Sequence, residues 1–230
     1  MKTMNALSHT VASRQPVRRL LAVLMLALTA MAAVAAPAGP QQPFVSDAGD
    51  GEAVAIFAGG CFWCMEAAFD PVPGVVSTTS GYTGGHVDDP SYGDVTAETS
   101  GHSEAVKIVY KTAETDYDTL LDVFWHNVDP TDDGGQFCDR GDSYRSKIFV
   151  VDDAQAKAAE ASKTALENDP DAPSPIVTEI VPATTFYAAE DYHQNYYRKN
   201  PLRYKFYRAS CRRDAILEKR WGDAAGGHAD

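Results

Sequence analysis

The stretch AVAIFAGGCFWCMEAAFD, residues 53–70, decides the fold. Its first six residues form a continuous apolar run, which is typical of a buried strand. Two glycines interrupt the run, and residues 61–70 are predicted to form a helix. A strand that turns directly into a helix brings the residues of the turn to the helix N-terminus. Cys61 and Cys64 are therefore expected on the first turn of that helix.

Outward from this stretch, predicted strands and helices alternate along the chain. Hydrophobic periodicity and turn residues indicate where the other elements lie. Further strands are expected at 75–82, 104–110, 146–151 and 175–181, and further helices at 117–128, 154–166, 188–199 and 206–221. Residues 84–103 and 131–141 are expected to form polar loops. The alternation predicts an α/β (α+β) two-layer domain, and not a helix bundle or a β-sandwich.

The N-terminal segment is typical of an export signal. Arg18 and Arg19 precede an apolar run that ends in small residues, with cleavage expected after Ala35. A basic start, a short apolar stretch and a small-residue exit predict a secretory signal peptide over residues 1–35. An uncleaved N-terminal anchor is the alternative. The protein is therefore expected to be exported, most simply to a bacterial periplasm, where disulfides persist.

The rest of the chain is predicted to hold one domain. Residues 36–52 are rich in Pro, Gly, Gln and Asp and are expected to form a flexible leader without a core of its own. Residues 53–222 contain no second linker and no repeat, so they are interpreted as a single domain. Residues 223–230 are expected to be a disordered tail.

Composition and charge exclude several classes of protein. The chain has 230 residues, of which 44% are hydrophobic and 23% charged, as is ordinary for a globular protein. The formal net charge is −12, and residues 1–35 contain four basic residues and no acid, so the remainder carries −16. Phosphate groups would repel such a body, which argues against nucleic acid and anionic membranes as partners.

The two cysteines of the first helix are the centre of the predicted chemistry. A thiol at a helix N-terminus is close to free N–H groups that favour its anion, so a lowered pKa and a nucleophilic role are expected for Cys61. An inert disulfide or half of a zinc site are the alternatives for a C-x-x-C pair. Zinc would need two further ligands, and Cys138 and Cys211 are isolated in the sequence rather than a second close pair.

This pair belongs to the first of six sequence blocks that occur in a characteristic order. The blocks are GCFW at 60–63 with Glu66, GYTGG at 81–85 followed by Pro90-Ser91-Tyr92, GHSEAV at 101–106, HNVDPT at 126–131, DRGDSYRS at 139–146 and AEDYHQ at 189–194. Together they resemble the A-type peptide methionine sulfoxide reductases over about residues 53–201. Each block alone is a weak signal, but six in order are highly specific.

The resemblance implies both a fold and an activity. The implied fold is a ferredoxin-like two-layer plait with additional helices. The implied enzyme is a peptide-methionine (S)-S-oxide reductase, which repairs oxidised methionine, free or in proteins. In such enzymes Cys61 would attack the sulfoxide sulfur and become a sulfenic acid, and a second thiol would close an intramolecular disulfide. A thioredoxin-like dithiol would then restore the enzyme, with no metal, flavin or nicotinamide cofactor, and a monomer is expected.

Glu104 is the expected acid, because the sulfoxide oxygen leaves only when it is protonated. The resemblance assigns this role to Glu104, and the predicted strand supports it. Glu104 shares strand parity with the apolar residues Val106, Ile108 and Tyr110. A carboxyl group on an apolar face is desolvated, which raises its pKa toward that of a general acid.

The resemblance also assigns the remaining site residues. Tyr92 and Tyr144 would hydrogen-bond the sulfoxide oxygen, and Asp139 would complete the polar side of the site. Phe62 and Trp63 would receive the S-methyl group, for which aromatic side chains are suited. By sequence alone, each of these residues is more often part of an ordinary core.

The resolving thiol is left open among three cysteines. Many family members carry resolving cysteines in a Gly-rich C-terminal tail, whereas residues 204–213 here are basic, aromatic and predicted to be helical. Cys64 is favoured because it lies one helical turn from Cys61 in any fold. Cys138, which directly precedes Asp139, is second and Cys211 third; these two are alternatively expected to pair as a structural disulfide.

Two other functions are weighed against the reductase. Strand, C-x-x-C and helix are also typical of a thioredoxin-like disulfide oxidoreductase, although no suitable proline follows the motif. The other alternative is an acidic binding module that its cysteines merely cross-link. His102, His126 and His193 show no metal-ligand spacing and are interpreted as structural.

Overall fold

The computed structural model describes residues 46–226, which all lie in one compact unit. The predicted signal peptide and most of the predicted leader fall outside these residues, as do the last four. No helix within the described residues combines the length and the apolar character that a membrane span requires.

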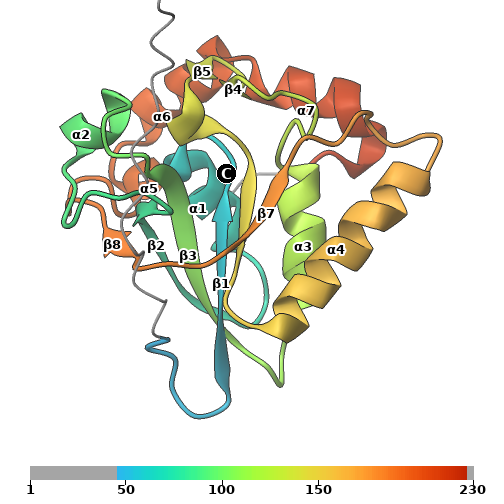
Figure 1. The fold of residues 1–230 in the computed structure, drawn as a ribbon. Helices are drawn as coiled ribbons and strands as arrows, with labels where there is room; N and C mark the ends of the chain where they lie inside the picture. The colour runs from blue at the N-terminus through green and yellow to red at the C-terminus, as the bar shows by residue number, and fades with distance from the viewer. Residues whose placement is uncertain (1–45, 227–230) are drawn as a thin grey trace, which may run out of the picture. The chain divides into compact units, whose positions relative to one another are not determined.

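A six-stranded mixed sheet forms the centre of this unit (Figure 1). Its order is β7-β6-β1-β3-β2-β8. The strands are β1 (Glu52–Ala58), β2 (Val75–Thr83), β3 (Ser103–Lys111), β6 (Lys147–Val150), β7 (Glu179–Pro182) and β8 (Tyr187–Ala188). β1 is antiparallel to both of its neighbours, β3 and β6, whereas β6 and β7 are parallel. The four inner strands therefore have the order of a ferredoxin-like plait, as predicted.

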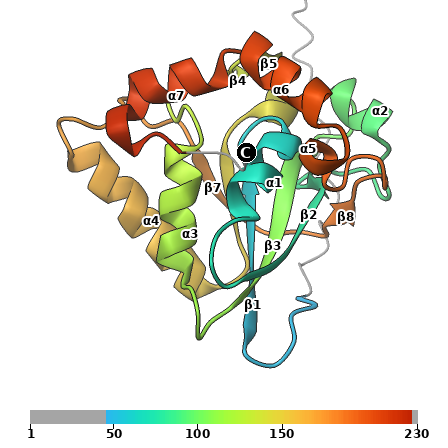
Figure 2. The same cartoon turned by 180° about the vertical axis from the view of Figure 1, so that it is seen from behind.

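Two crossover helices and a third long helix cover one face of the sheet. α1 (Phe62–Phe69) links β1 to β2, α3 (Tyr117–His126) follows β3, and α4 (Asp153–Asn168) follows β6. Figure 2 shows α1 and α3 in front of the sheet. The apolar residues of these helices pack against the strands in one core cluster.

The aromatic centre of this core joins three elements. The Phe57 ring of β1 stacks on Phe69 of α1 at 5.3 Å and on Phe124 of α3 at 5.0 Å between centroids. All three side chains are fully buried. Alternation along β1 sends Val54 and Ile56 to the other face, where a smaller apolar cluster forms. The continuous apolar run of β1 is thus explained, because both of its faces are covered.

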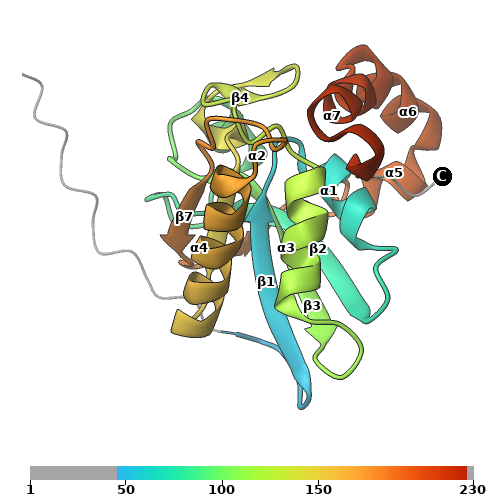
Figure 3. The ribbon, with the colours of Figure 1, turned by 90° about the vertical axis from the view of Figure 1, so that its right-hand side faces the viewer.

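The C-terminal region is the largest departure from the predicted elements. Residues 188–199 were expected as one helix, but only α5 (Tyr196–Lys199) is helical, and β8 pairs with β2 instead. Residues 206–221 form parts of two helices, α6 (Pro201–Ser210) and α7 (Arg213–Trp221). They are separated at Arg212, whose φ is +55°. Figure 3 shows α5, α6 and α7 beside the N-terminal end of α1.

The two predicted loops contain short elements that periodicity does not reveal. The loop before β3 contains α2 (Tyr92–Thr96), which begins with a capping box between Ser91 and Asp94. The loop after α3 contains the two-residue strands β4 (Gly135–Gln136) and β5 (Asp139–Arg140), followed by the turn η1 (Asp142–Tyr144). β7 begins later than the predicted strand, after the cis Ser174–Pro175 bond.

The structure extends further at both ends than the predicted domain. Lys107 forms an ion pair with Asp47 at 2.7 Å, and Ala48 packs against the smaller apolar cluster. At the other end, η2 (Gly222–Ala224) continues from α7, and the Gly226 N–H donates to the His126 carbonyl at 2.7 Å. The described parts of the predicted leader and tail therefore contact the domain.

Candidate active site

The turn between β1 and α1 places Cys61 at the helix N-cap. Gly60 has φ +78°, a conformation that favours glycine, and a Cβ on it would lie 2.6 Å from the Cβ of Gln136. This close approach brings the β4–β5 hairpin against the turn. Cys64 follows on the first turn of α1, so both cysteines occupy the positions that the sequence predicts.

Both thiols are buried under the C-terminal helices. Cys61 is 5% exposed and Cys64 1%, and they share a cluster with Tyr197 and Tyr204. Cys61 and Cys64 are free, and the Cys61 thiol donates a hydrogen bond to the Cys64 sulfur. The two thiols therefore titrate together.

The charges around the pair favour an anion on Cys64 rather than on Cys61. Burial raises the pKa of Cys61, as do the hydrogen bond to Cys64 and the carboxyl groups of Glu104 and Asp139. The hydrogen bond from Cys61 lowers the pKa of Cys64 to about 6, with the guanidinium of Arg213 assisting. Burial and the neighbouring acids thus oppose the lowering of the Cys61 pKa that the helix N-terminus is expected to give.

Glu104 lies buried at the base of the site. It is 2% exposed, and its Oε2 accepts a hydrogen bond from the Phe62 N–H at 3.1 Å. Burial raises the pKa of Glu104 to about 8, and the hydrogen bonds from Phe62 and Tyr144 only partly oppose this. Its position on the apolar face of β3 agrees with the predicted strand parity. Near neutral pH, Glu104 can therefore donate a proton.

The two expected tyrosines meet at Glu104. Tyr144, at the end of η1, hydrogen-bonds both to the Glu104 carboxyl group and to Tyr92. Burial raises the pKa of Tyr92 to about 12, so both phenols are neutral donors. The Tyr92 N–H donates to Glu190 at 2.9 Å, which fixes the start of α2. Two hydroxyl groups and one carboxyl group thus converge near Cys61.

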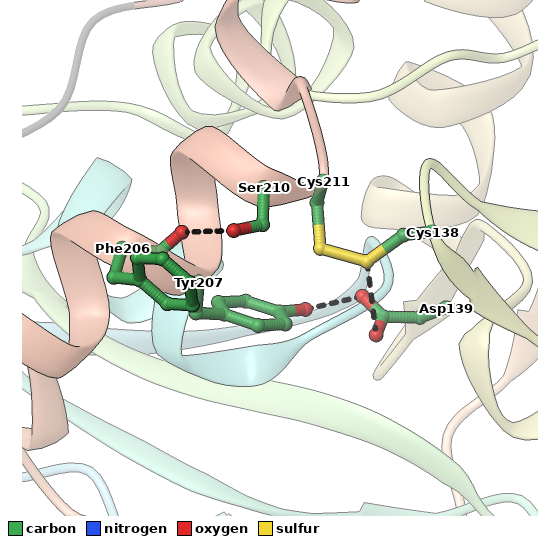
Figure 4. Close-up of a disulfide and its surroundings, with 6 residues drawn as sticks. All are labelled: Cys138, Asp139, Phe206, Tyr207, Ser210 and Cys211. Carbon is green, nitrogen blue, oxygen red and sulfur yellow. Dashed lines mark hydrogen bonds between the residues drawn. A yellow bond between two sulfur atoms is a disulfide. The ribbon is translucent and has the colours of Figure 1, made fainter.

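Asp139 joins the site to the C-terminal helices. The Tyr207 hydroxyl donates a hydrogen bond to Asp139 Oδ2 (Figure 4). The neighbouring Cys138 forms a disulfide with Cys211 at the end of α6, also drawn in Figure 4. The alternative in which Cys138 and Cys211 pair with each other is thus confirmed. Burial raises the pKa of the Asp139 carboxyl group.

Phe62 and Trp63 differ in their exposure. Phe62 is fully buried, whereas Trp63 is half-buried and stacks on Tyr196 with 3.7 Å between ring centroids. The Trp63 indole N–H donates to His193 Nδ1 at 3.0 Å, and the His193 ring packs against Phe62 with 4.9 Å between ring centroids. His193 is thus a structural partner of both aromatic residues, in agreement with its interpretation from the sequence.

The other two histidines also make structural contacts. His102 Nδ1 accepts from the Gly85 N–H at 3.1 Å, and His126 Nδ1 lies 2.9 Å from the Asp122 carbonyl. Among residues 46–226, one group of three candidate metal donors comes together, formed by Cys138, Asp139 and Cys211. Its two sulfur atoms are bonded to each other and offer no thiolate.

Sequence reasoning missed four residues that enclose the thiols from the C-terminal helices. These are Tyr204, Tyr207, Arg208 and Arg213. The only signal for them was the basic, aromatic composition of residues 204–213, which does not indicate the side that a helix presents to the site. Their positions depend on how α6 and α7 pack, and no local pattern specifies that packing.

Two buried free thiols beside a buried carboxyl group and two phenols are typical of a thiol-dependent oxidoreductase. Comparison with known proteins identifies the kind. The chain belongs to the peptide methionine sulfoxide reductase family, whose model matches residues 53–225. It is accordingly a peptide-methionine (S)-S-oxide reductase, as the sequence predicted.

Curated relatives and solved structures agree with this assignment. The chain is 49% identical to peptide methionine sulfoxide reductase MsrA of Bacillus pumilus, over 75% of this chain and 97% of that one. It is 54% identical to MsrA 2 of Caulobacter vibrioides, over 73% and 85%. Methionine sulfoxide reductase A of Corynebacterium diphtheriae superposes with a TM-score of 0.60 at 31% identity, over 71% and 84%. Reduced Mxr1 of Saccharomyces cerevisiae gives 0.61 at 31%, over 66% and 87%.

Proposed function

We propose that Cys61 reduces methionine S-sulfoxide with Glu104 as the proton donor. The observation that carries this assignment is the buried Glu104, which accepts a hydrogen bond from the residue next to Cys61 and whose pKa burial raises to about 8. A sulfoxide oxygen between Glu104 and the Tyr92 and Tyr144 hydroxyls would accept hydrogen bonds from all three. Protonation of that oxygen makes the sulfur electrophilic and lets the oxygen leave.

The first step balances as an oxygen transfer. The Cys61 thiol and the sulfoxide give a Cys61 sulfenic acid and methionine. The Cys61 sulfur loses two electrons and the substrate sulfur gains them. Cys61 gives up its proton as its sulfur attacks, and the hydrogen-bonded Cys64 sulfur is the nearest acceptor.

Cys64 is the resolving thiol in this proposal. The Cys64 sulfur attacks the Cys61 sulfenyl sulfur, a disulfide forms, and the hydroxyl group leaves as water with the proton of Cys64. The hydrogen bond between the two thiols in the resting state supports this assignment. Cys138 and Cys211 are already paired with each other, which makes them poorer candidates for this step.

An external dithiol completes the cycle. A thioredoxin-like protein that carries two thiols would exchange with the Cys61–Cys64 disulfide and leave as a disulfide itself. No group other than cysteine sulfur has to carry electrons, so the proposal needs no cofactor. Free methionine sulfoxide and exposed sulfoxides in proteins are both candidate substrates of the monomeric enzyme.

The site of action is proposed from the N-terminal sequence. Residues 1–35 have the features of a signal peptide, and the Cys138–Cys211 disulfide suits an oxidising compartment such as the periplasm. Expression of the full chain in a Gram-negative host, followed by fractionation and N-terminal sequencing, tests this. A mature start at Ala36 in the periplasm supports export, and full-length protein in the cytoplasm refutes it.

The reaction itself is tested with separated sulfoxide epimers. The chain without residues 1–35 is mixed with the S or the R epimer of a peptide methionine sulfoxide and dithiothreitol. Rapid methionine formation from the S epimer alone, abolished in Cys61→Ser, is the expected result. Turnover of neither epimer, with Cys61 shown to be reduced, would instead favour a general thiol–disulfide oxidoreductase.

A further inference from the structure

The C-terminal helix α6 presents a tyrosine and an arginine to the Cys64 sulfur. The Tyr204 hydroxyl hydrogen-bonds to Cys64, and Tyr204 lies in the same buried cluster as both thiols. Arg208, one helical turn further along α6, donates from Nη1 to the Tyr204 hydroxyl at 3.3 Å. A continuous chain of contacts therefore runs from Arg208 through Tyr204 to Cys64.

Asp214 of α7 holds the Arg208 guanidinium group in place. Its Nη2 pairs with Asp214 of α7 at 2.5 Å, and its Nε donates to the same carboxylate at 2.8 Å. The Arg208 side chain is 3% exposed, whereas that of Asp214 is 53% exposed. Burying a guanidinium group is expensive unless its geometry is fixed by several partners, so this arginine has little freedom to turn away.

A second arginine, on α7, fixes the helix pair above the thiols. Arg213 Nη2 donates to the carbonyl of Asn127 at 2.7 Å and to that of Gly59 at 3.1 Å. Its guanidinium group also lies 4.3 Å from the centre of the Phe137 ring. These contacts connect α7 to the turn that carries Cys61 and to the β4–β5 hairpin.

The positive charges that lower the pKa of Cys64 come from these two helices. Arg208 and Arg213 lower the pKa of Cys64, together with the hydrogen bonds from Cys61 and Tyr204. The acidic groups face the pair from the sheet side and the hairpin. The titratable and charged groups around the pair are Cys61 at the N-cap of α1 and Cys64 on α1, Tyr92 on α2, Glu104 on β3, Asp139 on β5, Tyr144 on η1, Tyr197 on α5, Tyr204, Tyr207 and Arg208 on α6, and Arg213 on α7.

We propose that Tyr204 and Arg208 are positioning residues for disulfide formation between Cys64 and Cys61. Arg208 orients the Tyr204 hydroxyl, and that hydroxyl holds the Cys64 sulfur toward Cys61 and stabilises its negative charge as it attacks. This inference rests on the proposed resolving role of Cys64. In the step concerned, the S–S bond forms, the S–O bond of the Cys61 sulfenic acid breaks, and water leaves.

The decisive experiment separates the two chemical steps in Tyr204→Phe. The reduced enzyme is mixed with one equivalent of S-sulfoxide peptide, and quenched samples are analysed for methionine and, by mass spectrometry, for the Cys61–Cys64 disulfide. Loss of a hydrogen bond to a charged sulfur should slow disulfide formation about tenfold at pH 6. The rise of that rate with pH should move to higher pH, and methionine release in the same samples reports the first step separately.

Tyr197→Phe is the matched control. Tyr197 lies in the same cluster as Tyr204, but its hydroxyl donates to Asp70 at 2.5 Å rather than to Cys64. This variant should form the disulfide at the wild-type rate at every pH. Equal slowing in both variants, or a wild-type rate and pH profile in Tyr204→Phe, overturns the inference.

Arg208 is tested through a conservative pair of variants. Arg208→Met should slow disulfide formation, and Arg208→Lys should restore part of the rate because it keeps the charge. Circular dichroism and an intact Cys138–Cys211 disulfide establish that each variant is folded. If Arg208→Met misfolds, Tyr204→Phe and Arg208→Lys decide the outcome. A wild-type rate of disulfide formation in both of these variants refutes the positioning role.

Cys64→Ser distinguishes failure of the inference from failure of the proposed function. If Cys64→Ser still closes a disulfide with Cys61, another cysteine is the resolving thiol, and both proposals fall. If Cys64→Ser stops at the sulfenic acid, the resolving role stands. An unchanged Tyr204→Phe profile then rejects the positioning role alone.

Discussion

At the residue scale, one buried carboxyl group decides the chemistry. Glu104 is buried, and ionisation of a buried carboxyl group is unfavourable, so burial raises its pKa to about 8. The parity of the predicted strand indicated a desolvated carboxyl group, and the family resemblance assigned the acid role to it. The structure supplies the physical reason, because β3 continues the core face as far as Glu104.

We expect Glu104→Gln to slow methionine release by about 100-fold or more, since an amide cannot deliver a proton. In the wild type, the rate of this step should fall as the pH rises above about 8, where Glu104 ionises. Single-turnover quench experiments across pH measure both effects. Alkylation of Cys61 should proceed in the variant, and an unchanged methionine-release rate would refute the acid role.

The same substitution should stabilise the fold at neutral pH. Below pH 4.5 the Glu104 carboxyl group is protonated in both the folded and the unfolded chain. Between pH 4.5 and about 8 only the folded chain retains the proton, so stability is lost as the pH rises. Glu104→Gln removes this loss, which amounts to up to about 3 kcal/mol at pH 7. Thermal unfolding of both proteins at pH 4 and pH 7 should show that the variant is more stable than the wild type at pH 7 only.

At the scale of elements, local sequence specified the first half of the chain better than the second. The strand, glycine turn and helix at 52–69 follow from short-range pattern, and the structure reproduces them. Residues 188–199 contain helix-forming residues, yet the Gln194 side chain hydrogen-bonds to the backbone of β2 at Ser80. Its Oε1 accepts from the Ser80 N–H at 2.9 Å, and Asn195 takes φ +53°. Such contacts across the fold override local helix preference.

The C-terminal helices are fastened by the Cys138–Cys211 disulfide, so their anchoring can be tested. The bridge spans 73 residues. In the chain-entropy model, its loss in Cys138→Ser/Cys211→Ser should destabilise the protein by about 4 kcal/mol. Chemical denaturation without reductant measures this value. Formation of the Cys61–Cys64 disulfide should also slow, because Tyr204 and Arg208 are carried by the loosened helices.

Wild-type stability in the double variant would show that the bridge contributes nothing to the fold. Ser210→Ala, next to Cys211, is the control for local disturbance. The Ser210 hydroxyl bonds only to the Phe206 carbonyl among the contacts described, at 2.7 Å. This control should keep both its stability and its disulfide-forming rate close to wild type.

At the scale of the whole molecule, acidic and basic groups face the two thiols from different parts of the fold. The sheet side and the β4–β5 hairpin supply acids, and the C-terminal helices supply arginines. The acidic groups are suited to donating a proton to the sulfoxide, and the arginines are suited to stabilising a sulfur anion. Both act on two thiols that the strand–helix turn holds one helical turn apart.

Turnover should accordingly have a bell-shaped dependence on pH. The lower limb near pH 6 reports ionisation of the coupled thiol pair, and the upper limb near pH 8 reports Glu104. Steady-state rates with saturating dithiothreitol, corrected for the thiolate fraction of the reductant, measure both limbs. Tyr204→Phe should move the lower limb alone, and Glu104→Gln should remove the upper limb. Limbs that do not respond to these variants would contradict the assignment.

The sequence by itself determined the family, the plait and the positions of Cys61, Cys64 and Glu104. These depend on short-range patterns, namely an apolar run broken by glycines, the parity of a strand and six motifs in order. Only the tertiary structure decided that Cys138 pairs with Cys211, that α6 and α7 enclose the thiols, and that arginines of these helices act on Cys64. Burial and electrostatic potential sum contributions from residues far apart in the chain, so no local pattern could reveal them.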